Sequence, residues 1–194
     1  MIPLSLPNLA GKEWEYVKKC IDTGWISTAG SFVDRFELEF ANYLGLNGAV
    51  SVVNGTAALH IALQLLGVKN NDFVIMPNVT FVASANAISY MGAEPILIDI
   101  DKADWQIDLD ILEDFLKNSC KRNSFDELIH SKTKRKISVL MIVHVQGNIC
   151  DMDRLLKICQ EHKLPVLEDA AEASGTMYRG KYAGTLGDIG CYSF

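Results

Sequence analysis

The sequence predicts an α/β fold: a three-layer, mostly parallel sheet with helices on both faces. Short β-rich runs alternate along the chain with segments of helical periodicity, which is the pattern of α/β domains. The runs at 137–145 and 165–168 are nearly continuous in apolar residues, as expected for strands buried on both faces of a parallel sheet. Six candidate strands with helical crossovers predict one sheet, and residues 1–194 are therefore expected to form one domain.

Two helices open the predicted order of elements. A helix over residues 12–23 would place Trp14, Val17 and Ile21 on one face. A second helix is expected to start after Ser31, whose hydroxyl can cap its first turn. Aromatic residues recur along this second helix at near-helical spacing, which is typical of a packed core.

Strands and helices then alternate to the end of the chain. Strands are expected at 49–53, 73–76, 95–98, 137–145, 165–168 and 189–194, and helices at 56–66, 80–91, 109–117 and 151–162. Residues 118–136 form a polar stretch between apolar runs, which predicts an excursion outside the sheet.

The composition argues against several classes of function. A chain of 194 residues with 49% hydrophobic residues is long enough to bury a sizeable core. Its net charge of −6 gives no basic surface for nucleic acid or an anionic membrane, and the basic cluster at 132–136 is typical of a solvated loop. Five cysteines without a CxxC pair indicate reduced thiols in the cytoplasm. With neither a secretory leader pattern nor an 18-residue apolar window, we expect no membrane span.

The first candidate binding residues come directly after the predicted strand at 49–53. In open α/β sheets, ligands bind beyond the carboxyl ends of the strands. Gly55 permits a tight turn there, and the helix that opens at Thr56 and Ala57 offers backbone N–H groups and a hydroxyl to a phosphate. A purely structural turn is the commoner role of this pattern. The GxGxxG and GxxxxGK[ST] fingerprints are missing, which disfavours dinucleotide binding and nucleotide hydrolysis.

The acidic end of the strand at 165–168 supplies a second candidate. Alternation along a strand sends Glu168 and Asp169 to opposite faces, so that one can line a crevice while the other is structural. A carboxylate there can pair with the protonated ring nitrogen of pyridoxal phosphate, although capping is the commoner role of such a residue. His144 near another strand end is a candidate general base, with positioning or packing the favoured interpretation. No His or Cys set has metal-ligand spacing, so no metal site is expected.

The ordered motifs of this chain resemble those of the DegT/DnrJ/EryC1/StrS sugar aminotransferases, which are fold-type I pyridoxal-phosphate enzymes. These motifs are IPL at 2–4, GSFVDRFE at 30–37, NGTAAL at 54–59, PNVTFVASANA at 77–87, His144, EDAAE at 168–172 and GDIGCYSF at 187–194. Each is modest alone, but together and in order they cover essentially the whole chain.

The resemblance assigns roles in binding pyridoxal phosphate. It implies that the cofactor phosphate is held by Gly55, Thr56, Ala57 and Ser193. Phe81 matches the aromatic residue that stacks on the pyridine ring, and Asp169 matches the partner of the ring nitrogen. Glu172 takes the position near the ring hydroxyl where many family members carry glutamine, and an ionised carboxylate can accept a hydrogen bond there but cannot donate one.

The resemblance also implies a catalytic lysine beyond residue 194. The family's cofactor-linked lysine lies a few residues after the motif that ends at Ser193 and Phe194, so we expect a lysine within about ten residues of that point. The chain is accordingly expected to be the N-terminal part of the cofactor-binding large domain, without its last sheet strand and the C-terminal small domain, and to be inactive alone.

The activity implied by the resemblance is transfer of an amino group, usually from glutamate, to the C4 ketone of a UDP- or GDP-linked 4-keto-6-deoxy sugar. The segments at 105–108 and 143–147 look closest to the legionaminic branch, which serves nonulosonic acid and surface-polysaccharide synthesis. A homodimer with its active sites at the interface, and with residues 25–31 as candidate interface residues, is also implied.

Three alternatives remain open. A pyridoxamine-phosphate-dependent sugar dehydratase of the same family would carry a residue such as histidine in place of the lysine. A catalytically silent, truncated module could still bind the cofactor or a partner. A dinucleotide-dependent oxidoreductase is disfavoured by the missing glycine fingerprint.

Overall fold

The computed structural model describes residue 2 and residues 6–194, which form two compact units. One unit ends at Ser51 and the other runs from Val52 to Phe194. Of the IPL motif at residues 2–4, only residue 2 is among the described residues. The sequence pattern predicts one domain, whereas the chain divides into these two units, and each is described by itself.

The N-terminal unit consists of helix α1 (Glu13–Thr23) and helix α2 (Ser31–Leu44). Both helices end at a glycine in the left-handed region, which is a common helix terminator. Helix α2 begins at Ser31, but its N-cap is Gly30 and no side chain caps it. The predicted capping role of Ser31 is therefore wrong, because Ser31 already lies inside the first turn.

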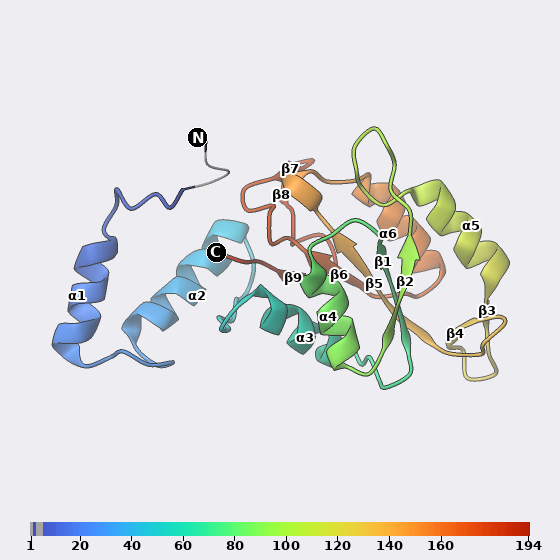
Figure 1. Ribbon diagram of the computed structural model, residues 1–194, viewed down its shortest axis with the longest axis horizontal. Coiled ribbons are helices and arrows are strands. Elements are labelled where there is room, and N and C mark those ends of the chain that lie inside the picture. Colours follow the sequence, from blue (N-terminus) through green and yellow to red (C-terminus); the bar gives the residue numbers. More distant parts are fainter. Residues whose placement is uncertain (1, 3–5) are drawn as a thin grey trace. The chain divides into compact units, whose positions relative to one another are not determined.

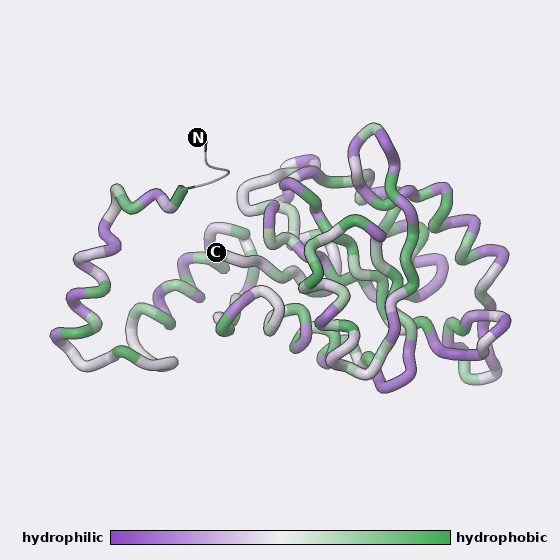
Figure 2. The backbone as a smooth tube through the Cα atoms, viewed as in Figure 1, coloured by the Kyte–Doolittle hydropathy of each residue, from purple (hydrophilic) through white to green (hydrophobic). Residues whose placement is uncertain are grey.

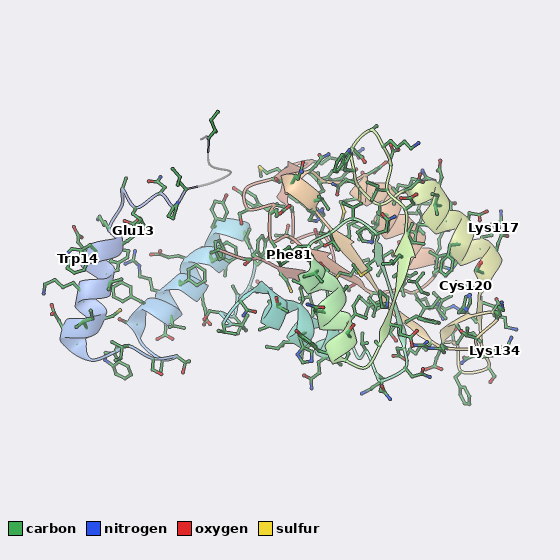
Figure 3. All side chains as sticks on the ribbon, viewed as in Figure 1. Glu13, Trp14, Phe81, Lys117, Cys120 and Lys134 are labelled. Atoms are coloured by element: carbon green, nitrogen blue, oxygen red, sulfur yellow. The ribbon has the colours of Figure 1, made fainter. Side chains whose placement is uncertain are left out.

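The apolar side chains of α1 are largely exposed. Figure 2 shows hydrophobic and hydrophilic segments alternating along this helix, and none of its residues is buried. Trp14, labelled in Figure 3, is 74% exposed. In α2, the rings of Phe36 and Phe40 stack with centroids 5.8 Å apart, and the ring of Phe32 lies 5.0 Å from that of Tyr16 on α1.

The second unit is built on a parallel sheet of five strands, in the order β2-β1-β5-β6-β9. The strands are β1 (Phe73–Pro77), β2 (Glu94–Ile98), β5 (Ile137–Val143), β6 (Val166–Asp169) and β9 (Ile189–Cys191). All four neighbouring pairs are parallel, which confirms the predicted sheet type.

The strand expected at 49–53 does not form. Val50 and Val53 are 83% and 87% exposed, and the backbone N–H of Ser51 donates to the Glu37 carboxylate, 2.7 Å away, instead of to a neighbouring strand. β-branched residues favour a strand only where they can pack on a pleated, half-buried surface. The apolar run at 49–53 has no such surface here and remains irregular.

Helices cover both faces of the sheet, which confirms the three-layer prediction. Helix α3 (Gly55–Leu65) lies beside α4 (Val82–Tyr90) on one face, and α5 (Leu109–Ser119) and α6 (Met152–Glu161) cover the other (Figure 1). Alternate residues of the three central strands β1, β5 and β6 supply the two cores. In β1, for example, Val74 packs with α3 and α4, whereas Ile75 packs with α5 and α6.

The polar segment at 118–136 lies outside the central sheet, as predicted. It folds into an antiparallel hairpin of β3 (Cys120–Arg122) and β4 (Leu128–His130), and Figure 3 labels Cys120 and Lys134 in this region. Arg135, from the basic cluster, pairs with Glu94 at 2.7 Å and covers the Phe73 ring at 3.8 Å. This arginine therefore has a structural role at the edge of the sheet.

The remaining elements are small. They are the 3-10 turn η1 (Val145–Gly147) and the hairpin of β7 (Met177–Tyr178) and β8 (Lys181–Tyr182).

None of the described helices is long and apolar enough to cross a membrane. All five cysteines are free, and burial raises the pKa of the Cys150 and Cys191 thiols to about 12.

Candidate functional site

A cavity of about 140 Å³ opens at the carboxyl edge of the sheet. It is lined by Asn54, Gly55, Thr56, Leu59, Phe81, Ala83, Asp169, Ala171, Cys191, Tyr192 and Ser193. Five of the residues singled out in the sequence therefore meet in one place, although they come from four separate segments of the chain. Ala57, His144 and Glu172 do not line this cavity.

One wall of the cavity is the N-terminus of α3. The Asn54 side-chain oxygen accepts from the Ala57 N–H at 2.8 Å and caps the helix. The N–H of Ala57, a predicted phosphate donor, is thus already paired, and Ala57 does not line the cavity. Within the described part of the chain, the N–H groups of Gly55 and Thr56 have no acceptor, as expected for the first turn of a helix.

Gly55 also lets the end of the chain approach this turn. A Cβ atom on Gly55 would lie 3.1 Å from the Cβ and 3.3 Å from the Oγ of Ser193. The absence of a side chain therefore brings the hydroxyl of Ser193 close to the helix N-terminus. This wall of the cavity is suited to an anion. It combines two free N–H groups, the hydroxyls of Thr56 and Ser193, and the positive end of the helix dipole.

A buried carboxylate, that of Asp169, lines the same cavity as the helix N-terminus. Asp169 ends strand β6 and is only 6% exposed. Its Oδ2 accepts from the Ser84 hydroxyl at 2.7 Å, and its Oδ1 accepts from the Ala171 N–H at 3.3 Å. Burial raises the pKa of Asp169, and these hydrogen bonds only partly oppose that effect. None of the described lysine or arginine residues pairs with this carboxylate, so a cationic group in the cavity would relieve the cost of its charge.

Phe81 stands at the entrance to the same cavity. It is the N-cap of α4, where Figure 3 labels it, and its side chain is 76% exposed. The first turn of the helix also carries Ser84, which is fully buried and binds Asp169. Ser84 is not among the residues singled out in the sequence, because its partner Asp169 lies 85 residues away.

Glu168 faces away from the cavity, as the alternation along the strand predicts. Its carboxylate accepts from the Gly184 N–H at 2.7 Å and the Leu186 N–H at 2.6 Å, and also from the N–H of Gly187. His144 Nε2 lies 2.8 Å from the same carboxylate. Burial alone would raise the pKa of Glu168, but the hydrogen bonds from His144 and the backbone outweigh burial and lower it. Glu168 therefore organises the segment that precedes β9.

His144 and Glu172, both candidate site residues, have other contacts. His144 is fully buried, and its imidazole contacts Glu168 instead of lining the cavity. Glu172 is exposed, and its carboxylate accepts from the backbone N–H of Gln146 at 2.6 Å, which holds the η1 turn. The structure thus gives both residues positioning contacts. Among the described residues, no group of three His, Cys, Asp or Glu side chains could hold a metal ion.

The fold and this cavity define an α/β protein with a cavity at the carboxyl edge of a parallel sheet, where ligands bind in proteins of this architecture. Residues 7–194 match the DegT/DnrJ/EryC1/StrS aminotransferase family, and the chain belongs to this family.

Relatives of known name span the whole chain. GDP-perosamine synthase from Caulobacter vibrioides is 44% identical over 193 residues, which cover 100% of this chain and 47% of the relative. The Bacillus subtilis protein EpsN, whose name describes a pyridoxal phosphate-dependent aminotransferase, is 36% identical over 193 residues, with the same coverage of 100% and 47%. An aminotransferase from Psychrobacter cryohalolentis, solved by X-ray crystallography, has a TM-score of 0.83 at 31% identity, over 99% of this chain and 45% of that one. This chain spans about half the length of the curated relatives it matches.

Proposed function

We propose that the protein containing this chain is a pyridoxal-phosphate-dependent aminotransferase acting on a nucleotide-linked sugar. The observation that supports this most strongly is the pairing, in one cavity, of an anion-binding helix N-terminus with the buried carboxylate of Asp169. A ligand with a phosphate at one end and a protonated ring nitrogen at the other matches both groups. Pyridoxal phosphate has this arrangement.

The residues present fit the cofactor at each end. The N–H groups of Gly55 and Thr56, with the hydroxyls of Thr56 and Ser193, would hold the phosphate. Phe81 would lie against the ring face. Asp169 would hold a proton on the ring nitrogen, and by doing so favours the bound cofactor as an acceptor of electrons. When bound, pyridoxal phosphate supplies an electron sink for carbanion chemistry, and the protein supplies orientation and electrostatics.

The described cavity is one part of a larger site. Its volume of about 140 Å³ is below the roughly 300 Å³ at which small-molecule pockets begin, and the chain spans about half the length of its relatives. We infer that other residues of the whole protein, or of a second copy in a homodimer, complete the walls. Residues 25–31 remain our candidates for that interface. The assignment of residues 1–194 to the large domain and the cytoplasmic location belong to the same proposal.

The substrate proposal rests on the relatives. Transfer of an amino group from glutamate to the C4 ketone of a 4-keto-6-deoxy sugar was expected for either a UDP- or a GDP-linked substrate. A relative named for GDP-perosamine, at 44% identity, favours a GDP-linked sugar. The more specific expectation of a legionaminic-type substrate remains a prediction.

The proposed function requires an amine that bonds covalently to the cofactor. We expect borohydride reduction of the whole protein with bound cofactor, followed by peptide mapping, to place the pyridoxyl adduct on a lysine within about ten residues after Phe194. That lysine would have to reach a cofactor aldehyde in the cavity that Asp169 lines.

An adduct on Lys181 or on any other lysine of this chain would contradict that placement. A histidine at the expected position, with no covalent adduct, would move the function to the dehydratase of the same family. The reduced protein without added cofactor serves as the control.

A further inference from the structure

Two hydroxyl groups form a short chain that ends on Asp169. Thr80 Oγ1 lies 2.8 Å from Ser84 Oγ, and Ser84 Oγ lies 2.7 Å from Asp169 Oδ2. Ser84 is fully buried on α4, and Thr80 is half-buried just before that helix. Because the two residues are four apart at a helix start, their side chains share one face. The face is turned toward the end of β6.

When Asp169 is ionised, its charge sets the direction of these hydrogen bonds. An ionised carboxylate has no proton to donate, so the Ser84 hydroxyl must donate to it. Ser84 has then used its only proton, so its oxygen can only accept from Thr80, whose hydroxyl lies 2.8 Å from Ser84 Oγ and 3.2 Å from the carbonyl oxygen of Phe81. The Ser84 hydroxyl thus points its dipole at the carboxylate, and a hydrogen bond donated by Thr80 polarises it further.

The two carboxylate oxygens of Asp169 have different hydrogen-bond partners. Oδ2 is held by Ser84, whereas Oδ1 has only the longer contact with the Ala171 N–H at 3.3 Å. Oδ1 is therefore the oxygen with capacity left for a ligand in the cavity. Phe81, which also lines the cavity, accepts from the Ser84 N–H through its carbonyl at 3.3 Å. One turn of chain thus fixes both the aromatic residue and the hydroxyl that orients Asp169.

The groups around Asp169 raise or lower its pKa, and the Ser84 hydrogen bond is one of them. Burial raises the pKa of Asp169, and the nearby carboxylate of Glu172 raises it as well. The hydrogen bond from Ser84, the N–H of Ala171 and the nearby His144 act in the opposite direction. Cys191 on β9, with a buried thiol, and Tyr192 are further titratable residues that line the same cavity. Ser84 is the first of the groups that favour the ionised form.

We propose that Ser84, supported by Thr80, is a positioning residue that holds Asp169 ionised and oriented to pair with the protonated ring nitrogen of the cofactor. This inference rests on the proposed function. Ser84 acts through Asp169, and it needs no contact with the cofactor or the sugar.

The test uses the whole protein loaded with pyridoxal phosphate and compares Ser84→Ala with Ser84→Thr. Loss of one hydrogen bond to a charged group is expected to weaken cofactor binding about tenfold in Ser84→Ala, measured as the dissociation constant of the cofactor. Removing a donor to the ionised form raises the pKa of Asp169, so the acidic limb of the kcat profile moves to higher pH. The KM for the sugar stays near the wild-type value. Ser84→Thr retains the hydroxyl and is expected to restore both the dissociation constant and the pH profile.

Ser89→Ala is the matched control. Ser89 lies on the same helix, is exposed, and bonds only to the carbonyl of Ala85, at 3.1 Å. A second variant, Thr80→Val, leaves the buried serine in place and covers the case in which Ser84→Ala does not fold. It should shift the pH profile in the same direction by a smaller amount, and an unchanged profile would overturn the role of the hydroxyl chain.

The outcomes separate this inference from the function on which it rests. If wild type binds pyridoxal phosphate and Ser84→Ala behaves like Ser89→Ala, the positioning role is wrong and the proposed function stands. If Ser84→Ala has the same effect in an Asp169→Asn background, Ser84 does not act through Asp169 and the inference fails. If wild type binds no pyridoxal phosphate, the proposed function fails and the inference fails with it.

Discussion

In the whole protein, Asp169→Asn is expected to lower the rate of amino transfer by at least about 10²-fold while most of the cofactor remains bound. Asparagine has nearly the same shape and can still accept a hydrogen bond from Ser84, which lies 2.7 Å from the native carboxylate. It cannot carry the negative charge that holds a proton on a ring nitrogen. Removal of one preorganised electrostatic group from an active site commonly costs about 10²–10³ in kcat.

Cofactor binding should change much less, by about the tenfold expected for Ser84→Ala, because the proposed phosphate contacts come from Gly55, Thr56 and Ser193 on another wall of the cavity. Single-turnover rates and the dissociation constant of pyridoxal phosphate measure the two effects separately. Asp114→Asn, an exposed carboxylate on α5 that bonds only to Asn118, is the matched control. Unchanged turnover in Asp169→Asn would show that this carboxylate is not the partner of the ring nitrogen.

Glu168→Ala is expected to have the largest effect on stability, lowering the free energy of unfolding by about 3–5 kcal/mol. The wild-type carboxylate is fully buried and accepts hydrogen bonds from three backbone N–H groups and from His144. Alanine would leave all of these donors without an acceptor, and an unsatisfied buried donor keeps its desolvation cost. The exposed Glu161 on α6 provides a control, since its replacement by alanine should change stability by no more than about 0.5 kcal/mol.

The effect of Glu168 should depend on pH with a defined sign. Its pKa is lowered in the folded protein, so its contribution is fully present above the pKa of an unfolded glutamate, about 4.3. The contribution is lost as the pH falls through the lowered folded-state pKa. Urea unfolding of wild type and Glu168→Ala should therefore differ most at neutral pH and converge in acid. Hydrogen exchange of the N–H groups of Gly184, Leu186 and Gly187 offers a local readout, and unchanged protection of these amides would contradict the account.

Alternation in the sequence was sufficient to place two adjacent carboxylates on opposite faces, but it left open which of them lines the cavity. Successive residues of a strand face opposite sides, and the structure indeed turns Asp169 to the cavity and Glu168 to the segment before β9. The parallel order of the central strands was predictable for a similar reason, since continuous apolar runs require cover on both faces. These features depend on local pattern and on a general property of sheets.

Other features depended on partners that a local pattern does not contain. The apolar run at 49–53 looked like a strand, but strand formation needs a neighbouring strand, and the Ser51 N–H is bound by Glu37 instead. Ala57 was a candidate phosphate donor, but the Asn54 side chain takes its N–H. Ser84 was missed because its importance lies in a contact with Asp169, 85 residues away in sequence.

The central claim is that one cavity holds the phosphate and the ring nitrogen of pyridoxal phosphate at its two walls. A crystal structure of the whole protein, grown with pyridoxal phosphate, tests this most directly. We expect the phosphate within hydrogen-bond distance of the Gly55 and Thr56 N–H groups and of the Ser193 hydroxyl, and the ring nitrogen within hydrogen-bond distance of Asp169. A cofactor bound elsewhere, or bound in this cavity with its ring nitrogen directed away from Asp169, would contradict the account.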